Sequence, residues 1–180
     1  MQRITYFLTN IETYGDKIPS YDKFAPDSLT EPTGLQNEKT TNDKAFSKTV
    51  LIVDDDFDMT SIFSLGLQDE GLEVYSYNDP LDALSQFRPN FYDLLLIDIN
   101  MPKMDGRTVL KELKQDPDFR MIPVVVLTTS KDDEDVYKSY DLGVNSYIVK
   151  PVTFEALVDI LQTLEKYWFE IVELPQPRES

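Results

Sequence analysis

Residues capable of joint chemistry follow four of the chain's short apolar runs. The sequence contains no His and no Cys, so the groups available for chemistry are carboxylates, hydroxyls and lysine amines. The residues in question are Asp54, Asp55 and Asp56 after the first run, Asp98 after the second, Thr128 and Thr129 at the end of the third, and Lys150 and Pro151 after the fourth. Taken singly, such residues are ordinary helix caps, strand residues and surface side chains.

Brought together, these residue types define one chemistry. Three carboxylates at one place raise one another's pKa unless a cation neutralises them, and all-oxygen ligands suit Mg²⁺. Asp98 is then placed to attack phosphorus as a nucleophile, while the metal and the Lys150 ammonium offset charge on the phosphoryl oxygens. The Thr128 hydroxyl is a hydrogen-bond donor for one of those oxygens. The chemistry alone therefore predicts a phosphoryl-accepting aspartate.

A repeated strand–helix pattern brings these residues together. From Thr49 onward, short apolar runs alternate with amphipathic stretches, which is typical of parallel strands joined by helices. The predicted strands cover residues 50–53, 73–76, 94–97, 124–127 and 147–149, and the predicted helices lie near 58–70, 80–87, 106–115, 133–141 and 154–168. Right-handed crossovers favour an α/β fold, a doubly wound (βα)5 parallel sheet of the flavodoxin-like order 2-1-3-4-5. Such sheets bind ligands at the carboxyl ends of their strands, where the residues above fall.

The composition argues against several other functions. Seventeen Lys and Arg against 33 Asp and Glu give a formal net charge of −16, with no basic patch for nucleic acid or an anionic membrane. The apolar runs are too short to span a bilayer, and the N-terminus has no signal-peptide pattern. We therefore expect a soluble, cytoplasmic protein that contacts neither nucleic acid nor membrane directly.

The first 48 residues differ in texture from the rest. They contain Pro19, Pro26 and Pro32 and a polar stretch over 36–44, and no helical or strand period lasts long enough to bury a face. We predict a disordered or loosely structured extension over residues 1–48 and one folded domain over 49–180. The residues after the last predicted helix are too few for a separate output domain.

Four motifs in this order and at these spacings resemble the CheY-like receiver domain of two-component response regulators. They are Val53-Asp54-Asp55-Asp56, the stretch from Leu96 to Gly106 around Asp98, Val126-Leu127-Thr128-Thr129-Ser130, and Tyr147-Ile148-Val149-Lys150-Pro151. Asp54 and Asp98 are 44 residues apart, Asp98 and Thr128 are 30 apart, and Thr128 and Lys150 are 22 apart. The resemblance covers roughly residues 48–168.

The resemblance assigns roles to the acidic residues. Asp98 matches the phosphoacceptor, and Asp54 and Asp55 match the acidic pair that binds Mg²⁺ together with it. Asn100 matches the position whose backbone carbonyl completes the metal site. Asp56 has no fixed role in the family pattern, and we expect it either to cap the following helix or to lie behind the metal ligands.

The remaining matches concern the phosphoryl group and the response to it. Thr128, followed by Thr129, matches the switch hydroxyl, Lys150 the phosphate-pairing lysine, and Tyr147 an aromatic side chain that turns inward on activation. The surface formed by the fourth helix, the fifth strand and the fifth helix then changes shape and signals by protein contact. Pro151 matches a position that is often preceded by a cis peptide bond.

The resemblance also implies partners. Without His, the chain needs a phosphohistidine on a separate sensor histidine kinase or phosphotransfer protein as its donor. The stretch from Ile122 to Pro175 resembles small stand-alone receivers that pair with phytochrome-type sensor kinases, several of which form dimers through this region. The aromatic end of the last predicted helix, Lys166-Tyr167-Trp168-Phe169, fits a homodimer contact and closure of the domain's own core equally well.

One enzyme class competes with the receiver interpretation. Asp56-Phe57-Asp58-Met59-Thr60 matches the DxDxT nucleophile motif of haloacid-dehalogenase-type phosphatases. In that motif the nucleophile directly follows its strand, whereas Asp56 lies two residues beyond Asp54, and Asp98 has no role. We therefore favour a receiver that is not a dedicated enzyme and only hydrolyses its own phosphoryl group slowly. Phosphorylation of Asp98 or of Asp56 distinguishes the two hypotheses.

Overall fold

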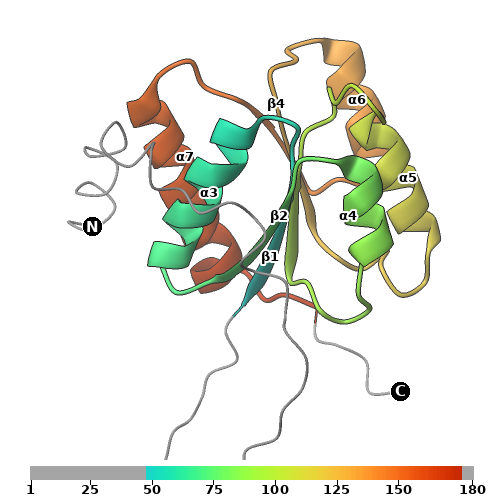
Figure 1. Cartoon of the computed structure of the whole chain (residues 1–180), viewed down its shortest axis with the longest axis horizontal. Coiled ribbons are helices and arrows are strands. Elements are labelled where there is room, and N and C mark those ends of the chain that lie inside the picture. The colour runs from blue at the N-terminus through green and yellow to red at the C-terminus, as the bar shows by residue number, and fades with distance from the viewer. Residues whose placement is uncertain (1–47, 176–180) are drawn as a thin grey trace, which may run out of the picture. The chain divides into compact units, whose positions relative to one another are not determined.

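In the computed structural model, which describes residues 48–175, a parallel sheet lies between two layers of helices (Figure 1). Its strands are β1 (Thr49–Val53), β2 (Glu73–Tyr77), β3 (Leu94–Ile97), β4 (Val124–Thr128) and β5 (Ser146–Val149). The strand order is β2-β1-β3-β4-β5, and every neighbouring pair is parallel. The predicted doubly wound fold is confirmed, and each predicted strand boundary is right to within one residue. The extension predicted over residues 1–48 lies outside the described residues except for Lys48.

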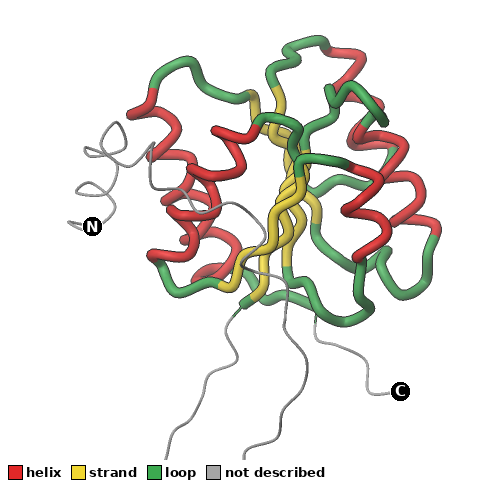
Figure 2. Tube along the Cα trace, in the orientation of Figure 1, coloured by secondary structure: helices red, strands yellow, loops and turns green. Residues whose placement is uncertain are grey.

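The helices divide between the two faces of the sheet (Figure 2). One face carries α3 (Phe57–Asp69) and α7 (Phe154–Glu165), and the other carries α4 (Pro80–Gln86), α5 (Gly106–Gln115) and α6 (Asp133–Asp141). The last predicted helix, over 154–168, is α-helical only as far as Glu165. It continues as η2 (Lys166–Ile171), a π-helical segment that places Trp168 in the core. Among residues 48–175, no helix is both long enough and apolar enough to cross a bilayer.

Each face of the sheet has its own apolar core. The central strands β1, β3 and β4 are buried at every position because helices cover both of their faces. Successive residues point to opposite faces. Val50 and Ile52 accordingly pack with Phe63 under α3 and α7, whereas Leu51 and Val53 belong to the core under α4 and α5. The two cores hold the strand ends rigidly in place.

The carboxyl ends of the strands lie at the top of Figure 1, where the helices also begin. A side-chain oxygen caps the first turn of each α-helix, and the caps are Asp56, Asp79, Asp105, Asp132 and Thr153. Such caps accept hydrogen bonds from backbone N–H groups that have no partner inside the helix. They fix the loops between strand and helix, and those loops carry the candidate site.

Candidate functional site

Three side chains from three strand ends meet at the top edge of the sheet. Lys150 follows β5, and its Nζ lies 2.6 Å from Asp54 Oδ2 and 2.7 Å from Asp98 Oδ2. Asp54 follows β1 and Asp98 follows β3, and these two residues are only 3% and 5% exposed. Buried carboxylates of this kind are expected to be paired, and here one ammonium pairs with both.

The backbone places these residues by extending the strand ladders beyond the last strand residues. The Asp54 N–H donates to the Tyr77 carbonyl at 3.1 Å, and the Asp98 N–H donates to the Val53 carbonyl at 2.9 Å. The Lys150 N–H donates to the carbonyl of Thr128 at 2.7 Å. Backbone hydrogen bonds thus fix the main-chain positions of all three residues.

Burial dominates the electrostatics of Asp54. It raises the pKa of Asp54 to about 6, although the hydrogen bond and the charge of Lys150 act in the opposite direction. Burial also opposes the charged form of Lys150, but its hydrogen bonds to Asp54 and Asp98 outweigh this effect and raise the pKa of Lys150. Two carboxylates sharing one ammonium leave net negative charge in a buried place, which favours binding of a further cation.

Asp55 completes an acidic cluster that opens to solvent. One carboxylate oxygen from each of Asp54, Asp55 and Asp98 lies within 4.8 Å of the others, and Asp55 is exposed. The Asn100 N–H donates to Asp98 Oδ1 at 2.9 Å, which holds Asn100 beside the cluster. This all-oxygen set with excess negative charge fits a hard divalent cation with room for water ligands.

Thr128, at the end of β4, is linked to this cluster through Asn100. It is fully buried, and its Oγ1 accepts a hydrogen bond from Asn100 Nδ2 at 3.3 Å. The Ser130 N–H donates to the same oxygen at 3.4 Å. Thr129, the next residue, is exposed. Of the two predicted threonines, the structure therefore brings Thr128 to the site and turns Thr129 toward solvent.

Tyr147 on β5 is turned toward the loop that follows β4. Its hydroxyl donates to the Ser130 carbonyl at 3.2 Å, and its ring is half-buried against the core under α5. Burial is the main cause that raises the pKa of Tyr147. The side chain therefore links the edge strand to the segment that carries Thr128.

Asp56 and Pro151 lie next to the site residues in sequence but have other roles. Asp56 Oδ1 accepts from the N–H groups of Asp58 and Met59 at 3.0 and 3.2 Å, so Asp56 caps α3. Its own N–H donates to Asp54 Oδ1 at 3.0 Å. Every peptide bond of the described residues is trans, including the bond before Pro151, where the family resemblance implies a frequent cis form.

Two contributors to the site escaped the sequence-based prediction. Asn78 Nδ2 donates to the Asp54 carbonyl at 2.8 Å and to Thr60 Oγ1 at 3.0 Å, which fastens the loop between β1 and α3. Gly106 packs so closely on the loop after β3 that a Cβ at this position would lie 2.1 Å from the Asp98 carbonyl oxygen. The position of Gly106 at the start of a predicted helix was a usable signal, whereas nothing in the sequence pointed to Asn78.

The fold and this cluster of residues define a class of protein, and comparison with known proteins identifies the family. The model of the response regulator receiver domain matches residues 50–162, and the chain belongs to this family. Response regulator Rcp1 of Synechocystis sp. is 51% identical over 88 residues, which are 49% of this chain and 58% of Rcp1. The probable methanogenesis regulatory protein FilR2 of Methanothrix harundinacea is 42% identical over 84 residues, 47% of this chain and 54% of FilR2. The chain thus matches just over half the length of these two relatives.

Solved structures agree with this assignment. The phosphorylated cyanobacterial phytochrome response regulator RcpA superimposes with a TM-score of 0.67 at 35% identity, over 72% of this chain and 99% of that one. The Mn²⁺-bound form of Rcp1 gives a TM-score of 0.65 at 38% identity, over 71% and 99%. CheY4 of Vibrio cholerae gives 0.56 at 31% identity, over 65% and 98%. The predicted likeness to stand-alone receivers is confirmed, and the phosphatase alternative has no support.

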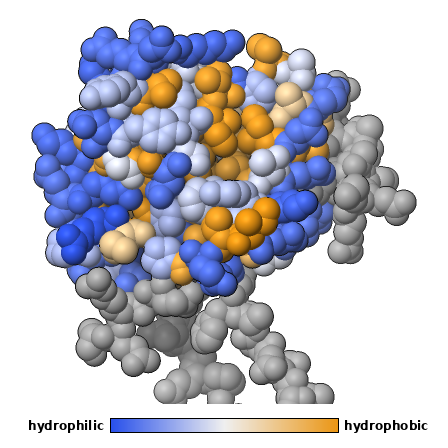
Figure 3. Space-filling view, turned by 180° about the vertical axis from the view of Figure 1, so that it is seen from behind, coloured by the Kyte–Doolittle hydropathy of each residue, from blue (hydrophilic) through white to orange (hydrophobic). Residues whose placement is uncertain are grey.

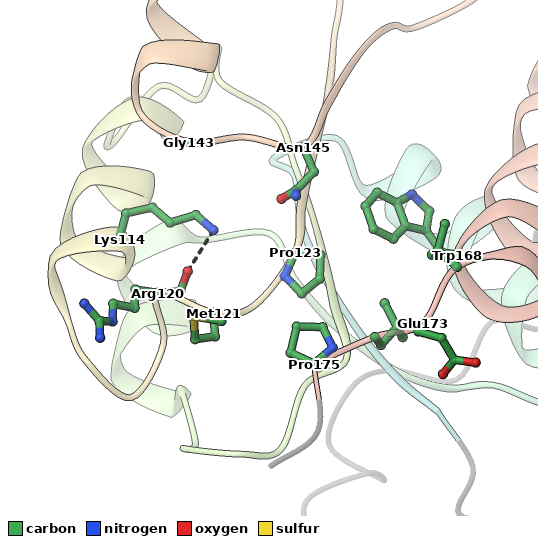
Figure 4. A pocket seen from close by; sticks show the side chains of 11 residues that line it. Lys114, Arg120, Met121, Pro123, Gly143, Asn145, Trp168, Glu173 and Pro175 are labelled. Carbon is green, nitrogen blue, oxygen red and sulfur yellow. Dashed lines mark hydrogen bonds between the residues drawn. The ribbon is translucent and has the colours of Figure 1, made fainter. Parts of the chain in front are cut away.

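A groove of about 440 Å³ lies at the opposite edge of the sheet, near the start of β4 (Figure 4). Lys114 and Arg120 line one side of it and Trp168 the other. Lys114 Nζ donates to the carbonyls of Arg120 and Ile122 at 3.1 and 2.8 Å, and burial lowers the pKa of Lys114. The groove is distinct from the acidic cluster because it lies at the amino ends of the strands.

Proposed function

We propose that this response regulator accepts a phosphoryl group on Asp98 from a phosphohistidine of a sensor histidine kinase or phosphotransfer protein. The observation that carries the proposal is the contact of Lys150 Nζ with Asp98 Oδ2 in a buried acidic cluster. A carboxylate oxygen of Asp98 forms the new bond to phosphorus, and the donor imidazole leaves with the electron pair of the broken bond. The Lys150 ammonium offsets negative charge on the phosphoryl oxygens.

Mg²⁺ is the proposed cofactor, held by the carboxylates of Asp54, Asp55 and Asp98 and by the backbone carbonyl of Asn100. The oxygen donors and the excess negative charge support a hard divalent ion. When bound, Mg²⁺ neutralises charge on the phosphoryl oxygens. The similar response regulator Rcp1 has been solved in an Mn²⁺-bound form, which supports binding of a divalent metal.

The proposed switch runs through Thr128 and Tyr147. A phosphoryl group adds a charge of about −1.5 to −2 and three strong acceptor oxygens, to which the Thr128 hydroxyl can donate. The loop between β4 and α6 then shifts, and Tyr147, which is hydrogen-bonded to this loop, moves with it. The phosphoryl group thus shifts the equilibrium toward a second conformation, in which the loop and Tyr147 are packed differently.

The proposed output surface is formed by α6, β5 and α7. Its exposed apolar side chains include Tyr137, Tyr140, Val152 and Phe154. In Figure 3, which shows the molecule from behind, hydrophobic residues lie among hydrophilic ones across the middle of the view. Apolar side chains framed by polar ones are typical of protein contact surfaces.

The donor and the place of action follow from the same chemistry. Phosphohistidine kinases draw on ATP, so we propose that phosphoryl transfer takes place in the cytoplasm, with a phytochrome-type kinase as the donor. The resemblance to RcpA, described as a phytochrome response regulator, supports this choice. The net charge of −16 favours signalling through protein contact over contact with nucleic acid or membrane. The protein acts as a phosphoacceptor with slow self-hydrolysis and not as a dedicated enzyme.

We also propose a homodimer through the region around η2. Trp168 belongs to the core, so part of the aromatic helix end closes the domain itself. Tyr167 and Ile171 are exposed on η2, and exposed Met121 lines the groove beside it. These three apolar side chains supply a contact patch that the core does not use.

The test is the mass of the intact protein after incubation with acetyl phosphate and Mg²⁺. The wild type and Asp56→Ala are expected to gain one phosphoryl group, and Asp98→Ala is expected to gain none. An adduct on Asp98→Ala, or its loss in Asp56→Ala alone, contradicts the proposal. Omission of Mg²⁺ serves as the control for the metal.

A further inference from the structure

We propose that Arg107 and Asp135 are positioning residues that hold the Ser130 hydroxyl away from the phosphoryl group on Asp98 and thereby lengthen the life of that group. The inference rests on the proposed function. Neither residue contacts the acidic cluster, and neither belongs to a motif that pointed to the site. Their side chains instead join the start of α5 to the loop between β4 and α6.

Arg107 is held at the start of α5 by hydrogen bonds to Asp105. Its Nε donates to both carboxylate oxygens of Asp105, at 3.0 and 3.1 Å, and its Nη2 donates to Asp105 Oδ2 at 2.7 Å. Its remaining terminal nitrogen, Nη1, donates to Asp135 Oδ1 on α6. The fork of the guanidinium is thus shared by two carboxylates, an arrangement that only arginine can provide.

Asp135 in turn holds Ser130, in the loop between β4 and α6. Its second oxygen, Oδ2, accepts a hydrogen bond from Ser130 Oγ at 2.6 Å. The hydrogen bond from Ser130 and then the contact with Arg107 lower the pKa of Asp135 below its usual value, which keeps the carboxylate charged. Arg107 and Asp135 are both only partly exposed, so this pair is less screened than an ordinary surface ion pair.

Both ends of the bridge touch the phosphorylation machinery. At one end, Gly106 precedes Arg107, and its N–H donates to the Ile99 carbonyl beside Asp98. At the other end, the Ser130 N–H donates to Thr128 Oγ1 and the Ser130 carbonyl accepts from Tyr147. The bridge therefore joins the turn beside Asp98 to the loop that carries Ser130 and follows Thr128.

The contact between Arg107 and Asp135 acts on the lifetime of the phosphoryl group through the Ser130 hydroxyl proton. While Ser130 Oγ donates to Asp135, its hydrogen is committed to a partner on α6. Once Ser130, which lies two residues after Thr128, is released from Asp135, its hydroxyl can turn. It can then form a hydrogen bond to a water molecule that attacks the phosphoryl group on Asp98. Water attacks phosphorus, the bond from phosphorus to the Asp98 oxygen breaks, and the carboxylate and inorganic phosphate are released. Freeing Ser130 therefore speeds the loss of the phosphoryl group.

The experiment measures the decay of the phosphorylated full chain after removal of acetyl phosphate. Asp135→Ala and Arg107→Gln are each expected to shorten its half-life by at least about threefold, and Arg107→Lys, which keeps the charge but not the fork, is expected to fall between. Glu134→Ala is the matched control, because it removes a neighbouring charge on α6 whose partner is the exposed Lys138. Combining Asp135→Ala with Ser130→Ala is expected to give the half-life of Ser130→Ala alone.

The possible results separate the two proposals. Half-lives of Asp135→Ala and Arg107→Gln equal to that of Glu134→Ala overturn the positioning role. A shortening by Asp135→Ala that persists in the Ser130→Ala background also overturns it, because the effect then does not pass through Ser130. Absence of an Asp98-dependent adduct on the wild type overturns the proposed function itself. Thermal unfolding of each variant shows that the half-lives compare folded proteins.

Discussion

At the scale of single residues, the site depends on one lysine shared by two buried carboxylates. The residue types and their spacing were enough to predict that Asp54, Asp98 and Lys150 meet, because parallel strands deliver their carboxyl ends to one edge. The protonation of Asp54 was not predictable from its type. It depends on burial, which raises the pKa of Asp54 to about 6 and which arises only when the chain folds.

The raised pKa of Asp54 predicts a pH-dependent stability. In the unfolded chain the pKa of Asp54 is near the usual aspartate value of 3.8, and in the folded protein it is about 6. The folded state therefore binds the proton more tightly, and the resulting stabilisation is complete below pH 3.8 and is lost as the pH rises through 6. Without Mg²⁺, the free energy of unfolding should fall over this window by about 3 kcal/mol from this group.

Asp54→Asn isolates this contribution in urea unfolding curves, because asparagine has the same shape but does not titrate. Between pH 4 and about pH 6.5, the free energy of unfolding of the wild type should fall relative to that of Asp54→Asn. A difference that stays constant over this range contradicts the raised pKa. Since Mg²⁺ needs the ionised carboxylate, its apparent affinity for the wild type should also decrease as the pH falls below about 6.

At the scale of elements, Gly106 allows α5 to pack closely on the loop that carries Asp98. The bounds of this helix were predicted correctly because Asp105 supplies a cap and the apolar positions repeat with helical spacing. The π-helical end of the last helix was not predictable. The spacing of Trp168 in the sequence fits a continued α-helix, and only packing against the core selects the wider turn. The bridge from Arg107 to Asp135 was also not predicted. It joins α5 to α6, and in the sequence both residues resemble ordinary charged surface residues.

Substitution of Gly106 by alanine tests how tightly α5 is seated. The new Cβ would lie 2.1 Å from the Asp98 carbonyl oxygen and 2.8 Å from Ile99 Cα, and both are backbone atoms that cannot rotate away. We expect Gly106→Ala to lower the free energy of unfolding by about 2–3 kcal/mol and to slow phosphorylation of Asp98. Urea denaturation and the rate of adduct formation measure the two effects.

Gly66→Ala is the matched control on α3. There the nearest atom to the new Cβ is Leu161 Cδ1 at 2.9 Å, the end of a side chain that can turn, and alanine favours the helix by up to about 1 kcal/mol. Its net effect on stability should therefore stay below about 1 kcal/mol. Equal losses in the two variants would mean that the close packing on Asp98 has no special cost.

At the scale of the whole molecule, the described part of the chain presents different chemistry at its two edges. The acidic cluster lies at the carboxyl ends of the strands, and the groove beside Trp168 lies at the amino ends (Figures 1 and 4). The topology was predictable because strands buried on both faces appear as uninterrupted apolar runs. The groove was not, because it is lined by residues from several segments that only the fold brings together.

The proposed dimer is tested by Ile171→Glu. Ile171 is 63% exposed on η2, so the substitution leaves the core intact while it places a charge in the proposed contact. Light scattering should give the mass of a dimer for the wild type and a mass near that of one 20.8 kDa chain for Ile171→Glu. Leu81→Glu, at 51% exposure on α4, is the control and should remain a dimer. A wild type that is already monomeric refutes the dimer.

The most direct test of the central claim is to locate the phosphoryl group. Treating the phosphorylated protein with borohydride reduces an aspartyl phosphate to homoserine, and fragment masses of the digested chain then show which position was converted. The geometry of Lys150, Asp54 and Asp98 predicts conversion at Asp98 and at no other aspartate. Conversion at Asp56, or at any residue other than Asp98, would contradict this account.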